Sequence, residues 1–278
     1  MTLAGLDEVL ADARRDGRGV GAFNVIQIEH AEAIAAAAER TGLPVVLQIS
    51  ENAVRYHGSL TPIGLATKAI AAAASVPCVL HLDHAESGGL VDEAVALGFT
   101  SVMFDASKLD DDINRQVTRS VAYRCHAAGV SVEAELGEIG GKDGVHAPGG
   151  RTDPADAARF VADTGVDALA VAVGSSHAMT SRTAQLDLAL IAAIHQQVPV
   201  PLVLHGSSGV ADGELVAAVE AGITKINIAT HLNTVLTSAL RAFLTADPTV
   251  VDTRKYLGAG RAAVTDETGR LLELLARR

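Results

Sequence analysis

The sequence of 278 residues lacks several features that mark specialised classes of protein. It has no tryptophan, 3% aromatic residues and two cysteines, Cys78 and Cys125, which lie in an expected strand and an expected helix. Two such cysteines indicate no disulfide framework and favour reduced thiols in a cytoplasmic protein. No apolar stretch reaches the roughly 20 residues that span a bilayer, and no basic region followed by an apolar run opens the chain. We therefore expect neither a membrane segment nor a signal peptide.

Positive charge is also scarce. The formal net charge is −11, and no basic stripe offsets it, which argues against nucleic acid and anionic membranes as partners. An anionic substrate would need local help from a metal, an arginine or backbone amides. With 49% hydrophobic and 20% charged residues, the chain is expected to be globular, and its length suits one large domain over residues 1–278.

Short apolar runs recur along the chain and predict eight strands buried on both faces, as in a parallel sheet. The predicted strands are 19–25, 44–49, 77–83, 101–105, 130–136, 168–173, 201–205 and 223–228. Segments with helical spacing lie between them, at 29–41, 62–74, 90–97, 113–128, 154–164, 186–196, 213–221 and 232–244.

Strand followed by helix, eight times over, predicts an α/β fold of the TIM (β/α)8 barrel type with a single domain. A doubly wound open sheet is the alternative, but the count of eight and the lack of a GxGxxG motif after the first strand favour the barrel. The Gly-rich stretch 137–152 has no periodicity, so we expect a long mobile loop after the fifth strand.

Polar residues collect where the predicted strands end, and that end of a βα barrel carries the active site. The opposite strand ends carry mostly glycine, proline and small residues. In chain order the polar ends are Asn24, Ser50, Asp83 with His84, Asp105, Glu135, Gly174 leading to His177, His205 with Gly206, and Asn227 with Thr230.

Three of these residues are histidines: His84, His177 and His205. Three imidazoles around one divalent ion with an open position are typical of a catalytic zinc. A single histidine at a strand end is more often a capping or packing residue, so a zinc site requires all three side chains to converge. Strand alternation turns His84 away from Asp83, so His84 reaches the mouth only where the pleat ends. His81 is expected deeper in the core, and the remaining histidines at the surface.

The carboxylates beside these histidines allow two interpretations. Asp83 could be an acid or base, or it could orient a histidine ligand. Asp105 and Glu135 could bind the same or a second cation, or they could make ordinary hydrogen bonds at strand ends.

Small residues follow the last two strands, where barrels of this type commonly bind phosphate. These are Gly206-Ser207-Ser208-Gly209 and Asn227-Ile228-Ala229-Thr230. Small side chains let backbone N–H groups approach an anion, and a following helix N-terminus adds its dipole. Alone, GSSG is usually a turn, so the prediction of a phosphate site depends on its position after the seventh strand.

Five short motifs follow one another along the chain: HLDH at 81–84, SVMFDAS at 101–107, SVEAELG at 131–137, PLVLHGSSG at 201–209 and KINIAT at 225–230. In this order they resemble the class II ketose-bisphosphate aldolases, over nearly the whole chain. The sequence is most similar to the shorter type that includes tagatose-1,6-bisphosphate aldolase, alongside fructose-1,6-bisphosphate aldolase. The resemblance implies a carbon–carbon lyase of carbohydrate metabolism, which cleaves a ketose 1,6-bisphosphate reversibly into dihydroxyacetone phosphate and glyceraldehyde 3-phosphate.

The resemblance also implies a role for each matching position. The catalytic zinc would be held by His84, His177 and His205, and Asp105 and Glu135 would match a second divalent position, with room for a monovalent cation. Asp83 would be the acid at the aldehyde-derived oxygen. The remaining positions would bind substrate: Asn24, Ser50, Gly174, Ala178, Gly206, Ser207, Ser208, Gly209, Asn227, Ala229, Thr230 and, for the distal phosphate, Arg254. A homodimer or homotetramer is the implied assembly.

The sequence departs from the family in three places. Relatives carry a Glu-Asp pair after two glycines of the loop, whereas Gly140-Gly141 is followed here by Lys142-Asp143, which makes Asp143 the substitute base and Glu138 the second choice. Ala178 stands where relatives have glycine. The stretch 50–57 is unusual, and its Arg55 or His57 could recognise a different aldehyde end.

Four alternatives remain at this point. They are a class II aldolase acting on another ketose 1-phosphate, a non-catalytic sugar-phosphate binder, a Schiff-base aldolase and a metal-dependent barrel hydrolase. A Schiff-base aldolase needs an inward, desolvated lysine, and the lysines are few; Lys225 on the eighth strand is better interpreted as structural or phosphate-side. The hydrolases often carry an HxH pair on the first strand, which this sequence lacks.

Overall fold

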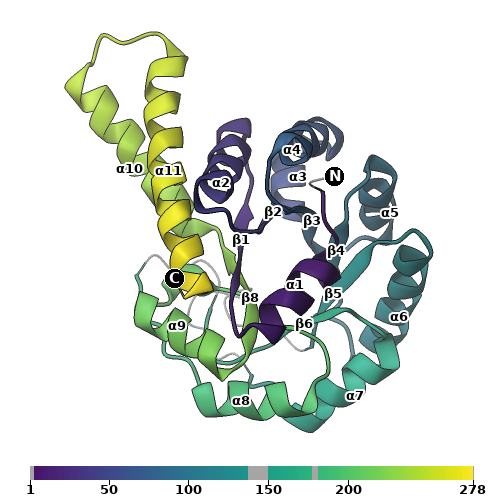
Figure 1. Ribbon diagram of the computed structural model, residues 1–278. Helices are drawn as coiled ribbons and strands as arrows, with labels where there is room; N and C mark the ends of the chain where they lie inside the picture. Colours follow the sequence, from purple (N-terminus) through teal and green to yellow (C-terminus); the bar gives the residue numbers. More distant parts are fainter. Residues whose placement is uncertain (1–2, 137–149, 177–180, 278) are drawn as a thin grey trace.

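The computed structural model describes residues 3–136, 150–176 and 181–277, and it confirms the barrel. Eight parallel strands pair in chain order, and the last pairs with the first (Figure 1). The strands are β1 (Val20–Asn24), β2 (Val45–Ser50), β3 (Cys78–Ala85), β4 (Ser101–Phe104), β5 (Ser131–Glu135), β6 (Ala168–Ala170), β7 (Leu202–Leu204) and β8 (Ile223–Ile228). Each lies within the predicted strand or within two residues of it.

Helices surround this barrel, and all eight predicted helices are present with ends shifted by no more than two residues. They are α2 (Ile28–Thr41), α4 (Thr61–Ala73), α5 (Gly88–Leu97), α6 (Asp111–Ala127), α7 (Pro154–Thr164), α8 (Leu188–Gln197), α9 (Asp212–Ala221) and α10 (Thr230–Ala246). Asp153 caps α7 as its sequence indicates, because its side chain accepts from the Asp156 N–H at 2.9 Å.

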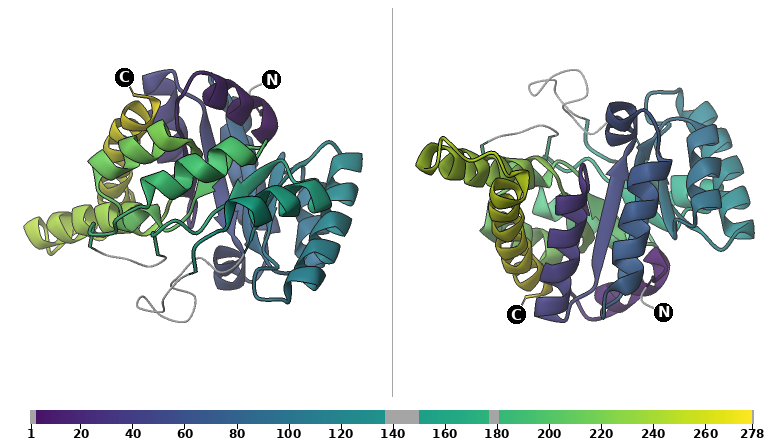
Figure 2. Two further views of the ribbon diagram at one scale, coloured as in Figure 1. Left: turned by 90° about the horizontal axis from the view of Figure 1, so that it is seen from below. Right: turned by 90° about the horizontal axis from the view of Figure 1, so that it is seen from above.

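Three α-helices were not predicted: α1 (Leu6–Arg15), α3 (Glu51–His57) and α11 (Thr253–Ala276). α3 occupies the stretch that looked unusual in the sequence, and its first turn is capped by the Ser50 side chain, which accepts from the Ala53 N–H at 3.2 Å. α10 and α11 form a hairpin that stands away from the barrel at its far end (Figures 1 and 2).

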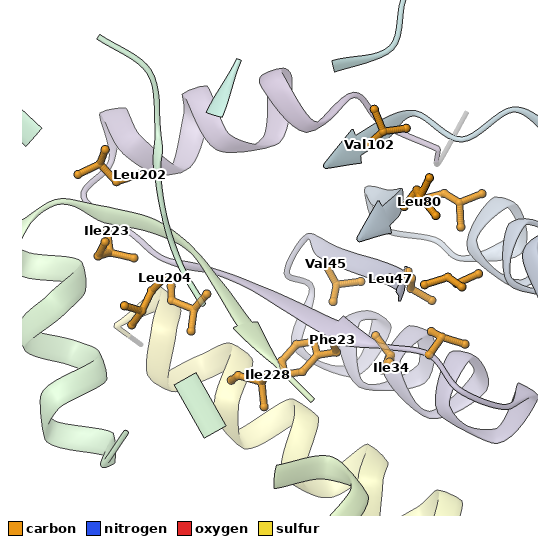
Figure 3. Close-up of a cluster of buried hydrophobic side chains, with 14 of the residues drawn as sticks. Phe23, Ile34, Val45, Leu47, Leu80, Val102, Leu202, Leu204, Ile223 and Ile228 are labelled. Carbon is orange, nitrogen blue, oxygen red and sulfur yellow. The ribbon is translucent and has the colours of Figure 1, made fainter. Parts of the chain in front are cut away.

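The apolar core has two parts. The larger part fills the layer between strands and helices, where Phe23, Leu47 and Leu204 face the helix ring (Figure 3). The smaller part fills one end of the barrel interior. Its members are inward side chains of the strands and one face of α1: Leu6, Val9, Leu10, Ala13, Val20, Ala22, Val46, Val79, Ala168, Ala170, Ala172 and Val203.

Polar side chains fill the other part of the interior. Gln48, His81, Ser101, Glu133 and Lys225 are all completely buried. His81 therefore lies in the core as expected, with its Nδ1 2.9 Å from Ser101 Oγ. Burying polar side chains costs free energy that an apolar core would not. A polar layer inside the barrel therefore indicates that these side chains support a functional site at the adjoining mouth.

His30 corrects one expectation, because it is buried on α2 and not at the surface. α2 packs against β2 on the barrel side and against α11, a helix that the sequence pattern had not revealed. Among the described residues, no helix is long and apolar enough to cross a membrane.

Gly222, between α9 and β8, provides a test of the fold. Its φ is +126°, and a Cβ there would lie 2.6 Å from the Cβ of His195. We expect Gly222→Ala to lower the free energy of unfolding by about 1–3 kcal/mol in urea denaturation, because alanine is strained in that conformation. Gly213→Ala is the matched control, since nothing lies within 4 Å of a Cβ at that helical position. Equal unfolding free energies for the two variants would contradict the packing described here.

Candidate active site and metal centre

A cavity of about 430 Å³ opens at the carboxyl ends of the strands. It brings together residues from β1, β2, β3 and β8, from the segments that follow them and from the segment after β7. Nine of the sequence-predicted site residues line it: Asn24, Ser50, Asp83, His84, Gly206, Ser208, Asn227, Ala229 and Thr230. The wall also includes six residues that the sequence analysis did not select: Ile26, Gln48, Asn52, Ala53, Tyr56 and Asn233.

His84 faces this mouth because β3 is irregular at its end. The register between β3 and β4 shifts between Leu82 and Ala85, and His84 has a φ of +51°. Regular alternation would have turned its side chain away from Asp83. The irregularity instead brings the His84 ring to 4.7 Å from the His205 ring, centroid to centroid, at 73°.

The two rings share their surroundings with carboxylates. One potential ligand atom from each of Asp83, His84 and His205 lies within 4.8 Å of the others, and the same holds for His84, Asp105 and Glu135. Imidazole nitrogens and carboxylate oxygens at such spacing suit a divalent ion such as zinc. The predicted third ligand, His177, lies outside the described residues, and so do Ala178, Asp143 and Glu138.

Asp105 orients His84. Its Oδ2 lies 2.9 Å from His84 Nδ1, while its Oδ1 accepts from the Ser107 hydroxyl at 2.6 Å. A carboxylate that accepts from one ring nitrogen fixes the tautomer and leaves the other nitrogen to face a metal. This contact favours the orienting role for Asp105, and its role as a ligand of a second ion stays a prediction.

Asp83 is held by amides from three other strands. Its Oδ2 accepts from Asn24 Nδ2 at 3.3 Å and from Gln48 Nε2 at 3.4 Å, and its Oδ1 accepts from Asn227 Nδ2 at 3.4 Å. Gln48 also donates to Asn24 Oδ1 at 2.7 Å. The carboxylate is thus fixed beside the cavity, 3% exposed, where it can exchange a proton with a bound molecule.

The two histidines have opposite electrostatic environments. Burial alone would lower the pKa of His84, but the charge of Asp83, the hydrogen bond to Asp105 and the charge of Glu135 outweigh it and raise the pKa to about 9. For His205, burial lowers the pKa well below its ordinary value, and the charge on His84 lowers it further. His205 is therefore a neutral imidazole, the form that binds a metal.

Two segments form a cradle on the far side of the cavity. After β7, the 3-10 helix η1 (Ser207–Gly209) follows Gly206, whose φ is +66°. The Ser208 hydroxyl accepts from the N–H groups of Ala229 at 3.3 Å and His231 at 3.2 Å, so it ties this segment to the start of α10. The positive end of the α10 dipole and small residues thus lie together at the cavity, as an anion site requires.

Gly206 is glycine for a steric reason, because a Cβ there would lie 2.6 Å from the Ser176 carbonyl atoms. Ser207 and Gly209 are buried under the same turn, and Ser207 Oγ donates to the Leu204 carbonyl at 3.0 Å. Gly174 has a φ of +121°, and its backbone passes close to the Gln185 carbonyl. These residues shape the cradle from beneath.

The structure does not bring three other candidates to the cavity wall. Arg254 lies at the start of α11 on the hairpin, with its side chain 89% exposed and paired with Asp252 at 2.9 Å. Arg55 pairs with Glu51 at 2.6 Å, and His57 Nε2 lies 2.6 Å from the Ile26 carbonyl. A contact of Arg254 with substrate inside its own chain is thus unsupported.

Glu133 is the main residue that sequence reasoning missed. It is completely buried in β5, two residues before Glu135, and Lys225 donates to its Oε2 at 2.8 Å. The pairing holds the Lys225 ammonium group inside the barrel, bonded to Glu133. A charged residue inside an apolar run was the available signal, since an inward carboxylate in a barrel needs a partner.

A proton and a metal ion compete for the His84 imidazole, and this competition can be tested. Below a pKa of about 9 this imidazole is protonated in the metal-free protein, so a metal ion must displace a proton. Apparent zinc affinity should therefore rise by about tenfold per pH unit from pH 7 to about 9 and then level off, measured with chelator-buffered zinc. The His126→Ala control, on α6, should show the same slope. An affinity independent of pH over this range would contradict the assignment.

Comparisons with known proteins agree with this geometry. Residues 4–278 match the family model described as "Fructose-bisphosphate aldolase class-II". The chain is 39% identical over 268 residues to a fructose-bisphosphate aldolase of Geobacillus stearothermophilus, covering 95% of this chain and 93% of that protein. It is also 39% identical over 302 residues to one from Thermus caldophilus, covering 99% and 98%.

Solved structures give the same result. The X-ray structure of the YdjI aldolase from Escherichia coli K12 is similar with a TM-score of 0.85 and 30% identity, over 98% of this chain and 97% of that one. A putative fructose-1,6-biphosphate aldolase from Coccidioides immitis is similar with a TM-score of 0.86 and 29% identity, over 96% and 94%. The chain belongs to the class II fructose-bisphosphate aldolase family.

Proposed function

We propose that the protein is a metal-dependent aldolase that reversibly cleaves a ketose 1,6-bisphosphate into dihydroxyacetone phosphate and glyceraldehyde 3-phosphate. The observation that supports the proposal is that the His84 ring, the fixed carboxylate of Asp83 and an anion cradle line one cavity, with the buried His205 ring 4.7 Å from the His84 ring. His84 and His205 supply the imidazoles, Asp83 the carboxylate, and Gly206 to Gly209 with the start of α10 the cradle.

The reaction needs negative charge to be stabilised beside a ketone. His84, His205 and His177 would hold a zinc ion, and the bound ion would supply that stabilisation as a Lewis acid, worth several kcal/mol. The neutral state of His205 and the orientation of His84 by Asp105 support this ligand set. Asp105 and Glu135 are proposed to bind a second divalent ion. A monovalent cation is proposed as an additional cofactor.

Asp83 is proposed to move the proton on the aldehyde fragment. In cleavage it takes the proton from the C4 hydroxyl, the C3–C4 bond breaks, and its electron pair stays with the ketone fragment. In synthesis Asp83 returns that proton to the oxygen. Its three amide partners keep both carboxylate oxygens in place beside the cavity. The base at the nucleophilic carbon is proposed to be Asp143.

The cradle is proposed to hold the phosphate of dihydroxyacetone phosphate. Backbone N–H groups near Gly206 and Ser208, with the α10 dipole, are proposed to offset the protein's net charge of −11 locally. Binding this remote group orients the reacting carbon, which converts binding energy into rate. Asn24 and Ser50 are proposed to line the rest of the cleft, while Gly174, Ala178 and Arg254 stay predictions.

A Schiff-base mechanism finds no support at Lys225. Its ammonium group is completely buried and bonded to Glu133 and Asn227, so it is not presented to a substrate. We also propose that the protein is cytoplasmic and assembles as a homodimer or homotetramer.

The decisive assay measures release of dihydroxyacetone phosphate from fructose and tagatose 1,6-bisphosphates and from ketose 1-phosphates. We expect a chelator to abolish it and borohydride with substrate to leave it intact. His205→Ala should lose stoichiometric zinc and lower kcat by about 10³-fold, because several kcal/mol of charge stabilisation disappear. His126→Ala is the control. Chelator-resistant activity, or full zinc content in His205→Ala, would count against the proposal.

A further inference from the structure

Glu133 and Lys225 form an ion pair in the middle of the barrel. Both side chains are completely buried, and Lys225 Nζ lies 2.8 Å from Glu133 Oε2. Below them the interior is alanine and valine, such as Ala22 and Val203. A buried pair of charges costs desolvation that apolar side chains of similar volume would not, so its presence in a barrel core points to a task beyond stability.

The first arm of the pair reaches the metal site. Glu133 Oε1 lies 2.9 Å from His205 Nε2. An ionised carboxylate only accepts hydrogen bonds, so the His205 proton must be on Nε2. The lone pair then belongs to Nδ1, which lies 3.6 Å from Glu135 Oε2, on the side of the ligand cluster. Glu133 thus fixes both the tautomer and the ring orientation of His205.

The second arm reaches the proposed acid. Lys225 Nζ donates to Asn227 Oδ1 at 2.9 Å. With its oxygen held by the ammonium group, the Asn227 amide must direct its nitrogen toward Asp83, where Nδ2 lies 3.4 Å from Oδ1. The same ion pair therefore sets the orientation of an amide that holds Asp83 in place.

We propose that the Glu133–Lys225 ion pair is a positioning device that orients His205 toward the metal through Glu133 and Asp83 toward the substrate through Lys225 and Asn227. Neither residue touches substrate. The inference rests on the proposed function, because it assigns supporting groups to that reaction. The metal arm, however, is measurable without any turnover.

A purely structural pair makes a different prediction from a positioning pair. If the two charges only neutralise each other, replacing both with uncharged side chains restores everything that a single replacement loses. If Glu133 positions His205, an uncharged double variant folds but still binds zinc poorly. The test is thus a comparison of Glu133→Gln, which leaves Lys225 unpaired, with Glu133→Gln/Lys225→Met.

The variants are compared in zinc affinity with a chromophoric chelator, in thermal unfolding, and in kcat and KM at saturating zinc. We expect the double variant to unfold at a higher temperature than Glu133→Gln, because no buried charge is left unpaired. Its zinc affinity should still be about 10- to 100-fold below that of the unchanged protein. Its kcat should fall by about tenfold or more with KM for the ketose bisphosphate nearly unchanged, since Asp83 loses its support.

Glu220→Gln is the control, since it removes a carboxylate that forms an exposed ion pair with Arg277. It should match the unchanged protein in all three measurements. Zinc affinity of the double variant within about twofold of the unchanged protein would overturn the Glu133 arm. An unchanged kcat at saturating zinc would overturn the Lys225 arm. If the unchanged protein binds zinc but cleaves no ketose phosphate, the proposed function fails, while the affinity comparison still decides the Glu133 arm.

Discussion

Closure of the sheet by pairing between β8 and β1 is the constraint on which the site depends. Ala22 lies opposite Asn227 in this pairing, so the first and last strands bring their polar ends to one mouth. Without closure, Asp83 on β3 and Asn227 on β8 would lie on distant parts of an open sheet. The barrel thus converts eight separate strand ends into a single ring of functional groups.

The interior of the barrel is divided into an apolar part and a polar part, and the division explains how charged groups survive there. Alanine and valine side chains and α1 close one end, which keeps water out. Above them Glu133 bonds both His205 and Lys225. The low dielectric surroundings strengthen each of these contacts, so a few buried bonds hold the metal-facing imidazole and the carboxylate of Asp83.

Most of the fold was predictable from the sequence, because buried parallel strands are continuous apolar runs and their spacing is regular. Three helices were missed: α1 precedes the first strand, α3 follows β2 directly, and α11 begins after the exposed segment around Val251. The cavity was anticipated from residues at strand ends, such as Asp83 and Asn227.

The finer geometry of the site was not predictable. His84 faces the mouth only because β3 is irregular, and alternation alone gave the opposite direction. Glu133 was overlooked because its partners, His205 and Lys225, are 72 and 92 residues away in the chain. The position of Arg254 on an extended hairpin depends on α10 and α11 together, which no local pattern shows.

The proposed activity depends on His84 and His205 converging on one cation, and crystallography of zinc-loaded protein at the zinc absorption edge tests this most directly. We expect one strong anomalous peak at the barrel mouth, about 2.0–2.1 Å from a nitrogen of each imidazole. A peak bound elsewhere, or zinc-loaded crystals with no peak between these two rings, would contradict it.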